Sequence, residues 1–570
     1  MKFSLDDKSL RILILGLTTL GQVACTHMIP EPHLRILWTN DTHGYLSPLY
    51  HREEGDNLFV DRARTQGRAG GFAHIATLVK RQRKQFPDRT LLVDSGDTWH
   101  GTVIPVRLAG TPVVEVMNAM GYDAMVPGNV DFFYNEETIH RLHSAANFPI
   151  LIANIYDQHW GERAAIPNTS PYVVRTVNGL KVGIIGMTYH WMARVTDHPQ
   201  WSFGLRVSEI QDDIDRLRND EDVDIVIMLS HMGWKADTRY AELVAGIDVI
   251  VGAHTHDTLY KPTLVFNSRS NRSVIIVQSG SHGKYLGQLD LEVRDKRVTA
   301  FHQTLFPVLA DSVREDPEIA GMIHAIREPY EKELQRVIAE TTTLLYRSGT
   351  WQSTADNLIT DALRARTMQD VSIAQPGRYG ASVLPGNITV EDIYNLVPTE
   401  SPVYLMSFTG ADLRRMFEDA IDNVISADPL QQIGGYMWRF SGIEIAVDFG
   451  RPHPERIVSM KVGTEIIHDA RQYSLAEFNM FFRNSPDAID VRKTGKIGPQ
   501  EIIAYVEKQK TVSPVLDHRI TDHHGTILGD HTDLHNINQQ TGRNEVELSN
   551  PVNYRYHGRL DRNNRLQLTR

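Results

Sequence analysis

The sequence predicts a two-domain protein, in which an α/β sandwich is followed by a smaller α+β domain. Its 570 residues are more than a single hydrophobic core usually serves. From residue 34 to about residue 305, short runs rich in Ile, Val and Leu alternate with polar loops and amphipathic stretches. That alternation is typical of buried strands separated by helices. A hydrophobic content of 41% and a charged content of 23% fit a globular protein.

The individual elements of the first domain follow from the length and composition of these runs. Runs of four to eight residues rich in β-branched side chains predict strands, and the clearest cover residues 34–38, 90–93, 182–185, 224–229 and 247–251. The longer amphipathic stretch at 73–85 predicts a helix. In the second domain, helices are predicted at 354–366 and 410–425.

Changes in composition along the chain predict its domain boundaries. We expect an export signal at 1–25, a catalytic domain at 30–310 and a linker helix at 311–345. A substrate-binding domain is expected at 346–520. Residues 521–570 lose apolar periodicity and become rich in His and Asn, which favours a poorly ordered polar tail.

The N-terminus has the pattern of an export signal. Lys2, Lys8 and Arg11 precede an apolar run at 12–20 that is too short to span a bilayer as a helix. Cys25 is the only cysteine in the chain and stands where a lipoprotein carries its acyl chains. We therefore expect a periplasmic protein that contacts the membrane only through a lipid on Cys25; the alternative is a cleaved signal with an incidental cysteine. A net charge of −11 without a basic cluster argues against nucleic-acid binding.

Five short polar clusters stand at or just after predicted strands. Loops at the carboxyl ends of strands converge in open α/β sheets, so ligands that are distant in sequence can meet there. The clusters combine carboxylate, imidazole and amide groups without sulfur, which suits Mn, Zn or Fe better than a structural thiolate zinc site. The candidate metal ligands are Asp41, His43, Asp97, Asn129, His231, His254 and His256.

The number of candidate ligands predicts two divalent metal ions, with Mn as the first choice. Seven ligands are too many for one ion and suit two ions that share a bridging carboxylate. Asp97 is the natural bridge, because it comes from the middle cluster and has small neighbours. Two ions about 4 Å apart can hold a hydroxide as the nucleophile and stabilise an oxyanion during in-line displacement. The sequence therefore predicts a hydrolase.

The order and spacing of these clusters resemble the calcineurin-like metallophosphoesterases, and specifically the periplasmic 5′-nucleotidase superfamily. The resemblance covers most of the mature chain, including the second domain. It implies that Asp41, His43, Asp97 and His256 hold one metal ion. It also implies that Asp97, Asn129, His231 and His254 hold the other, which makes Asn129 both a metal ligand and a catalytic candidate.

The segment around Asn129 departs from the nucleotidase pattern. Nucleotidases carry Gly-Asn-His-Glu-Phe-Asp there, and its His and final Asp form a dyad beside the scissile bond. Here Val130 replaces the His and Phe133 replaces the Asp, and neither side chain can transfer a proton. An ester alkoxide leaves poorly without a proton, whereas a thiol with an ordinary pKa near 8.5 can leave as a thiolate. The missing dyad therefore favours a sulfur leaving group.

Other segments are similar to the SoxB thiosulfohydrolases, a branch of the same superfamily. The similar segments are Gly70–Arg81, Ser95–Gly101, Gly280–Gly287, Gly377–Gly380, Leu384–Gly386 and Gln432–Arg439. Guanidinium groups suit tetrahedral oxyanions, so Arg378 and Arg439 are predicted to bind the sulfonate, with a salt bridge as the alternative role. The match is divergent, because that family has His and Trp where this chain has Asn129 and Val130.

Two function hypotheses follow from the sequence. The first is a SoxB-like thiosulfohydrolase that releases sulfate from a cysteine S-thiosulfonate on a sulfur-carrier protein with a C-terminal cysteine. The alternative is a 5′-nucleotidase or broader phosphomonoesterase that acts on a nucleotide. His100 and His282 lie in loops expected near the metals, where either could replace the missing acid or orient another ligand.

Overall fold

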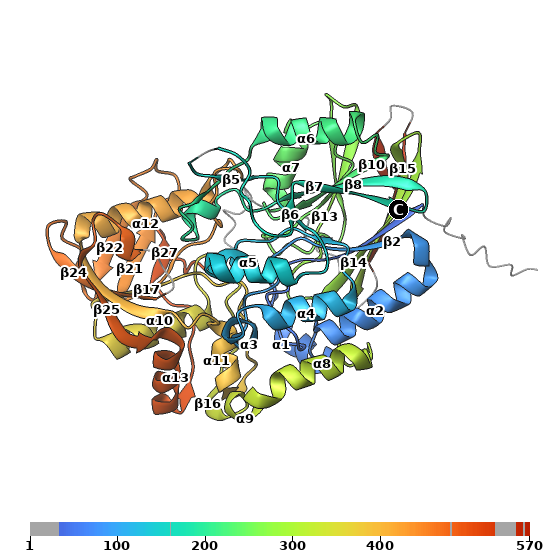
Figure 1. Ribbon diagram of the computed structural model, residues 1–570. Helices are drawn as coiled ribbons and strands as arrows, with labels where there is room; N and C mark the ends of the chain where they lie inside the picture. Colours follow the sequence, from blue (N-terminus) through green and yellow to red (C-terminus); the bar gives the residue numbers. More distant parts are fainter. Residues whose placement is uncertain (1–32, 160, 479–481, 530–553, 562–564, 570) are drawn as a thin grey trace, which may run out of the picture.

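The computed structural model describes residues 33–159, 161–478, 482–529, 554–561 and 565–569 (Figure 1). The predicted export signal and Cys25 lie outside these residues. Within the described part of the chain, no helix is both long enough and apolar enough to cross a membrane.

Two mixed sheets pack face to face in the first domain. The nine-stranded sheet has the order β29 (Leu566–Thr569), β28 (Tyr554–Leu560), β15 (Arg297–Pro307), β14 (Tyr285–Arg294), β1 (Leu34–Thr39), β2 (Thr90–Asp94), β3 (Ala124–Met125), β4 (Ile150–Leu151) and β6 (Thr169–Ser170). The six-stranded sheet has the order β12 (Thr263–Asn267), β13 (Arg272–Val277), β11 (Val249–Val251), β10 (Ile225–Ser230), β8 (Leu180–Met187) and β7 (Tyr172–Val177). Strands β5 (Ile155–Asp157) and β9 (Trp201–Phe203) form a separate small pair.

Helices cover the outer face of each sheet, so the domain has four layers (Figure 1). Those over the nine-stranded sheet are α2 (Phe72–Gln85), α4 (Thr111–Met120), α5 (Glu136–Ala145) and α8 (Pro317–Arg327). Those over the six-stranded sheet are α6 (Val207–Asn219) and α7 (Trp234–Leu243). The short helices α1 (Phe59–Gln66) and α3 (Val103–Arg107) lie in the loops after β1 and β2.

Strand β1 shows how the sequence specifies these layers. Successive side chains of a strand point to opposite faces. Leu34, Ile36 and Trp38 pack into the core between the sheets, whereas Leu37 packs under the helices. Strands β1 to β4 are parallel, and so are β8, β10, β11 and β13. Their carboxyl ends therefore meet at one edge of each sheet.

The second domain is built around three smaller sheets. The five-stranded sheet has the order β20 (Arg439–Ser441), β17 (Val371–Ala374), β24 (Gln472–Phe478), β19 (Pro402–Thr409) and β25 (Ile489–Ile497). The four-stranded sheet has the order β23 (Glu465–Ile466), β22 (Ile457–Val462), β21 (Ile443–Val447) and β27 (Ile520–Asp522). The three-stranded sheet has the order β18 (Gly386–Thr389), β16 (Val337–Thr341) and β26 (Thr511–Val512). Its helices are α10 (Thr354–Thr367), α11 (Val390–Leu396), α12 (Gly410–Ile425) and α13 (Gly498–Gln509). Side chains of these helices and strands form the apolar cores of the domain.

The predicted architecture of an α/β sandwich with an α+β second domain is confirmed. Each predicted helix and strand is present within a few residues of its expected bounds. The expected linker helix at 311–345 was wrong in its second half. There, α8 and the short α9 (Glu331–Leu334) give way to strand β16 at Val337, which pairs with β18 and β26.

The end of the chain also differs from the expected disordered tail. Strands β28 and β29 form a hairpin, and β28 pairs with β15 to extend the nine-stranded sheet. An edge hairpin needs only one apolar face, so its sequence can be largely polar.

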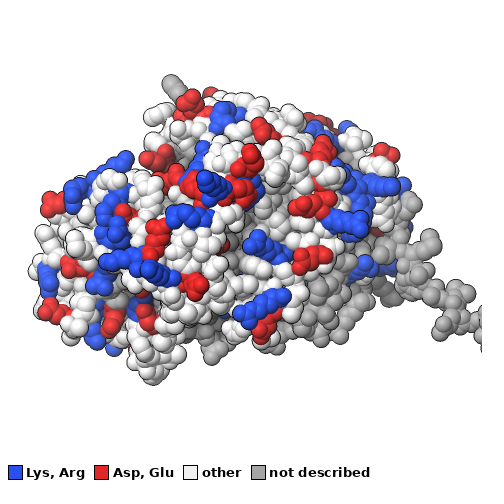
Figure 2. Space-filling model, turned by 90° about the horizontal axis from the view of Figure 1, so that it is seen from below, with Lys and Arg blue, Asp and Glu red and all other residues white. Residues whose placement is uncertain are grey.

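On the coloured part of the face seen in Figure 2, Lys and Arg are interspersed with Asp and Glu, without a continuous basic surface.

Candidate metal centre

The predicted metal ligands all stand in the loops that follow parallel strands. Asp41 and His43 follow β1, Asp97 follows β2 and Asn129 follows β3. His231 follows β10, and the pair of His254 and His256 follows β11. Each strand has buried side chains on both faces, so the loops are fixed to a rigid base. The two sheets thus present all five clusters at one edge of the domain.

Six of the seven predicted side chains form two groups that could each hold a metal ion. In the first, Asp41, His43, Asp97 and His256 offer ligand atoms that all lie within 4.8 Å of one another. In the second, Asp97, His231 and His254 meet the same limit. Asp97 belongs to both groups, as the predicted bridging role requires.

The seventh side chain, Asn129, reaches the second group. Its Oδ1 lies 2.8 Å from Nδ1 of His254. The chain therefore offers a donor set of carboxylates, imidazoles and one amide oxygen, the chemistry expected for two divalent ions.

The histidines of this site are in the protonation state that metal binding needs. The pKa of His43, His254 and His256 is held well below the usual value, first by burial and then by neighbouring positive groups. Their rings are therefore neutral at physiological pH, with a lone pair available. Nε2 of His43 and Nε2 of His256 lie 2.9 Å apart, so both nitrogens are directed at the same small volume.

His231 is oriented by the backbone and lies against two carboxylates. Its Nδ1 hydrogen-bonds the carbonyl oxygen of Ser95 at 2.6 Å, which leaves Nε2 facing Asp97 Oδ1 at 3.3 Å. Burial lowers the pKa of His231, but Asp97 and Asp41 outweigh it and raise the pKa to about 9. Nε2 is buried and also lies 3.9 Å from Asp41 Oδ1, so it faces both carboxylates. A metal ion would take the place of that proton.

The backbone is strained where it carries the ligands. Asp41, His43, Asp97, His254 and His256 have φ angles between 50° and 72°, a region that residues with a Cβ rarely occupy. Such conformations cost about 1–3 kcal/mol each and persist where the surroundings impose them. Their concentration on the ligand loops indicates that the fold is arranged for this site.

Asp131 holds two ligand loops together, a role that was not predicted from the sequence. Its carboxylate accepts hydrogen bonds of 2.7–3.0 Å from the backbone N–H groups of Asp97, Thr98, Trp99 and Gly128. The side chain is 2% exposed. Gly128 fits tightly beside it, because a Cβ there would lie 2.2 Å from Asp97 Oδ1. Asp131 therefore fixes the Asp97 loop relative to the Asn129 loop.

Two tyrosines cover the ligand histidines and were also missed. Tyr189, in the loop after β8, lies on the ring of His254 with centroids 4.2 Å apart. Tyr379, from the second domain, stacks on His43 at 5.2 Å. The hydroxyl of Tyr189 accepts a hydrogen bond from Gly434 N of the second domain at 3.1 Å. Both domains therefore enclose the site.

Arg378 lies beside the metal centre, as predicted for an oxyanion-binding residue. Its positive charge acts on the pKa of Asp41, His43, His254 and His256. The guanidinium also sits 4.5 Å from the ring centroid of Tyr436, a cation–π contact that fixes its position. Arg378 thus stays a candidate for binding a tetrahedral anion held at the metals.

The structure contradicts the same prediction for Arg439. This side chain is 1% exposed and pairs with Asp356, whose other oxygen pairs with Arg347. Its terminal nitrogens donate to the carbonyl oxygens of Gly349 and Thr350. Every guanidinium nitrogen is used inside the second domain, so Arg439 has a structural role there.

The two histidines proposed as replacement acids differ in their surroundings. His282 is fully buried and both ring nitrogens are engaged, with Ser281 Oγ and with the carbonyl oxygen of Tyr379. It has no N–H left for a substrate. Nδ1 of His100 is buried without a hydrogen-bond partner in the described chain, and its ring contacts Phe133 edge-on at 5.4 Å.

A cleft of about 620 Å³ between the domains begins at His100. Phe133 and Tyr134 line it from the first domain, and Tyr404 and Arg483 from the second. Phe133 occupies the position of the nucleotidase Asp, so the wall nearest the ligand loops is aromatic.

Comparisons with known protein families agree with the two-domain reading. Residues 34–258 match the calcineurin-like phosphoesterase family. Residues 337–487 match the C-terminal domain of 5′-nucleotidases. The 5′-nucleotidase of Bos taurus is 29% identical to this chain over 539 residues, which cover 85% of this chain and 90% of the bovine protein.

Solved structures with a similar fold include two proteins of Thermus thermophilus. The sulfate thiohydrolase SoxB of Thermus thermophilus superimposes with a TM-score of 0.80 at 25% identity, covering 87% of this chain and 97% of SoxB. The 5′-nucleotidase precursor of Thermus thermophilus superimposes with a TM-score of 0.76 at 25% identity, covering 86% of this chain and 99% of that one.

Replacement of Arg439 tests its structural role. Arg439→Ala opens a cavity and leaves the buried carbonyl oxygens of Gly349 and Thr350 without their donor, so it should lower the free energy of unfolding by about 3 kcal/mol or more. Arg451→Ala removes a half-exposed pair with Asp448 and should cost much less. Chemical denaturation measures both. Equal stability of the two variants would contradict the assignment.

The pKa of His231 predicts how metal affinity depends on pH. Below about pH 9 the metal-free protein keeps a proton on His231, and a metal ion must displace it. Affinity for the Mn ion that His231 ligates should therefore rise by up to about tenfold per pH unit between pH 6 and 9. Competition titrations with a chelator measure this dependence. His231→Gln should abolish it, whereas an affinity in the wild type that does not change with pH would refute the prediction.

Proposed function

Because this chain belongs to the calcineurin-like metallophosphoesterases that carry a 5′-nucleotidase C-terminal domain, a family of metal-dependent hydrolases, we propose that it is a SoxB-like thiosulfohydrolase. In this reaction a water oxygen bonds to the sulfonate sulfur of a cysteine S-thiosulfonate, and the sulfur–sulfur bond breaks. Sulfate is released, and the persulfide stays on the carrier protein. The similarity to SoxB extends over both domains and supports this choice.

The observation that carries the proposal is the identity of two side chains near Asn129, at the positions of the nucleotidase dyad. Val130 is 1% exposed, and its backbone N–H donates to Asp97 Oδ1 at 2.8 Å. Phe133 turns an aromatic ring toward His100. Neither position can protonate a leaving alkoxide, whereas a thiolate or persulfide can leave without a proton. The lack of a proton donor at these two positions suits a sulfur leaving group better than a ribose oxygen.

The aromatic pair of Trp438 and Phe482 in the second domain supports the same choice, because it is not arranged to hold a nucleobase between its rings. Met437 is fully buried in the core of that domain. Trp438 and Phe482 meet edge-on, with ring centroids 4.7 Å apart and a 78° angle between their planes. A base held between two parallel rings needs about 7 Å, twice a contact distance of about 3.5 Å. This pair leaves no such gap.

The chain's own residues would divide the work in a simple way. Two divalent ions held by the seven ligands would supply an activated water and neutralise negative charge on the substrate. Arg378 would bind a sulfonate oxygen through its planar guanidinium. Asp131 would keep the two ligand loops in register, and Tyr189 and Tyr379 would limit the access of bulk water. We assign Mn as the first choice of metal, with Zn and Fe as alternatives.

The alternative function is a 5′-nucleotidase, and one observation favours it. Several relatives that match about 85% of this chain are named 5′-nucleotidase, at up to 29% identity. Phosphate and sulfonate share tetrahedral oxygens, so Arg378 and the metal ligands would serve either. The partner would then be a nucleotide instead of a sulfur-carrier protein. In both cases we propose a periplasmic location with lipid anchoring through Cys25.

Parallel substrate assays separate the two functions. The purified protein, loaded with Mn, is offered AMP and a peptide that ends in a cysteine S-thiosulfonate. We expect sulfate release from the peptide and little phosphate from AMP. An Asp97→Asn variant, which removes the shared ligand, should lose either activity and serves as the control. Phosphate release at enzyme-like rates without sulfate would overturn the proposal in favour of the nucleotidase.

His100 provides a separate test of the leaving group. If sulfur departs as an anion, His100→Gln should lower kcat by less than about tenfold, because no proton donor is needed. If an alkoxide departs and His100 is the acid, the same change should cost about 10²–10⁴-fold. Steady-state kinetics on the preferred substrate, with Mn content checked in each variant, decide between these results. A loss in the larger range would contradict thiolate departure.

A further inference from the structure

The loop that carries Arg378 is held from the other domain by two histidines. Nε2 of His51 lies 3.3 Å from the carbonyl oxygen of Arg378, and Nε2 of His282 lies 3.0 Å from that of Tyr379. Tyr45 adds a hydroxyl that donates to Tyr379 O and accepts from Ala381 N, both at 2.9 Å. These contacts join the loop after β17 to the first domain directly behind the ligand histidines.

The hydrogen bonds determine which ring nitrogen carries the proton. A carbonyl oxygen can only accept, so Nε2 is the N–H donor in both His51 and His282. Nδ1 must then accept, and each has a donor in place. Lys284 Nζ lies 3.0 Å from Nδ1 of His51, and Ser281 Oγ lies 2.6 Å from Nδ1 of His282. Both imidazoles are therefore neutral donors with a fixed orientation.

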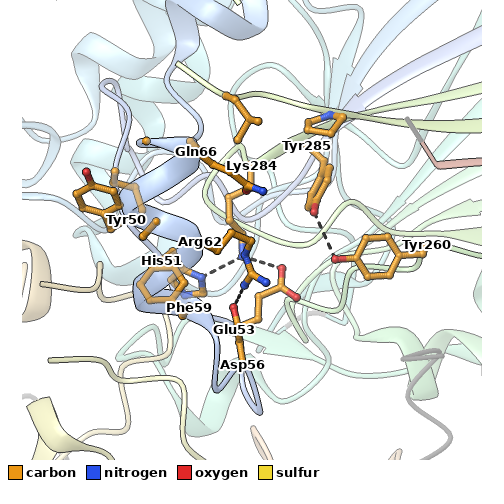
Figure 3. A pocket seen from close by; sticks show the side chains of 16 residues that line it. Tyr50, His51, Glu53, Asp56, Phe59, Arg62, Gln66, Tyr260, Lys284 and Tyr285 are labelled. Carbon is orange, nitrogen blue, oxygen red and sulfur yellow. Dashed lines mark hydrogen bonds and ion pairs between the residues drawn. The ribbon is translucent and has the colours of Figure 1, made fainter. Parts of the chain in front are cut away.

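Lys284 is held in turn by an acidic side chain (Figure 3). Its ammonium group pairs with Glu53 Oε1 at 2.8 Å, and the same oxygen accepts a hydrogen bond from Thr258 Oγ1 at 3.0 Å. Figure 3 shows Lys284 between His51 and Glu53. The donor that fixes His51 is thus fixed itself.

The two imidazoles form one stacked unit next to the metal centre. Their ring centroids lie 3.8 Å apart with a 27° angle between the planes. His282 also lies 5.6 Å from the ring of the metal-ligand candidate His43 and 5.9 Å from that of His256. We call His51 and His282 the histidine latch. It connects the backbone of Arg378 with the ligand loops through direct contacts.

We propose that the histidine latch positions Arg378 for oxyanion binding, so that the two domains form one anion site. This inference rests on the proposed role of Arg378 in binding the sulfonate or phosphate. A long side chain binds an anion more tightly when its backbone is already fixed, because less freedom is lost on binding. The latch supplies this fixation from the domain that also carries the metals. His51 and His282 are positioning residues, since their N–H groups are used by the loop.

Binding of inorganic anions tests the latch without reference to the substrate. Calorimetry measures the affinity of the full-length, Mn-loaded protein for sulfate and for phosphate. His51→Ala and His282→Ala should each weaken binding of the preferred anion by about tenfold, the value of roughly one or two hydrogen bonds. Both variants should keep the wild-type Mn content. His282→Gln places an amide N–H near the former Nε2 and should recover much of the affinity.

A double variant of Arg378 and His282 distinguishes positioning of Arg378 by the latch from a general loss of structure. Once Arg378→Ala has removed the guanidinium, adding His282→Ala should weaken anion binding no further. Tyr45→Phe, which removes only a hydroxyl, should give a smaller effect of the same kind. His324→Ala replaces an exposed histidine on α8 and should leave affinity unchanged.

Three results would overturn the latch. Full additivity of His282→Ala with an Arg378→Ala variant that itself weakens binding would show that the histidine acts elsewhere, and so would loss of Mn from the latch variants. If Arg378→Ala alone leaves anion affinity unchanged, the proposed role of Arg378 fails, and the latch inference fails with it. The Arg378→Ala single variant therefore tells the two failures apart.

Discussion

The site depends above all on the hydrogen bonding of Asp131. Two loops, each after a different strand, must meet closely enough for Asp97 and Asn129 to reach the same metals. Four backbone N–H groups from these loops converge on the Asp131 carboxylate. Four hydrogen bonds to one carboxyl group restrict both loops, and burial keeps water from competing for them. The positive φ angles of the ligands can persist because such contacts leave the loops no alternative.

The two domains contribute different residues to the site that Asp131 holds in place. The first domain provides a rigid edge where parallel strands end, and with it the metal ligands. The second domain adds Arg378 and Tyr379, which reach the ligand histidines only because the loop after β17 contacts the first domain. Val130 and Phe133 place apolar side chains near Asn129, where the nucleotidase pattern has a His and an Asp. In the proposed function, these neighbours of the ligand set determine which bond is cut.

Much of the fold and most of the metal site were predictable from the sequence. The strands were found because their side chains are buried on both faces, which produces continuous apolar runs. The ligands were found because each cluster directly follows such a run. The second-domain helix at α12 was predicted at its observed bounds, since its apolar periodicity is strong.

Other features could not be predicted because they depend on contacts between distant segments. The sequence alone does not distinguish Arg378 from Arg439. In the structure, Arg378 lies at the metal centre, whereas Arg439 is buried in an ion pair with Asp356. Asp131 reads as an ordinary loop residue until its four partners are known. His282 resembled an acid, but the carbonyl oxygen of Tyr379, 97 positions away, takes up its N–H. The tail hairpin was missed because an edge strand can remain polar.

The central claim is a pair of metal ions bridged by Asp97, and anomalous diffraction tests it most directly. A crystal of the Mn-loaded protein should show two anomalous peaks about 3.5–4 Å apart, with the carboxylate of Asp97 between them. His43 and His256 should border one peak, and His231 and His254 the other. A single peak, or two peaks that do not share Asp97, would contradict the account.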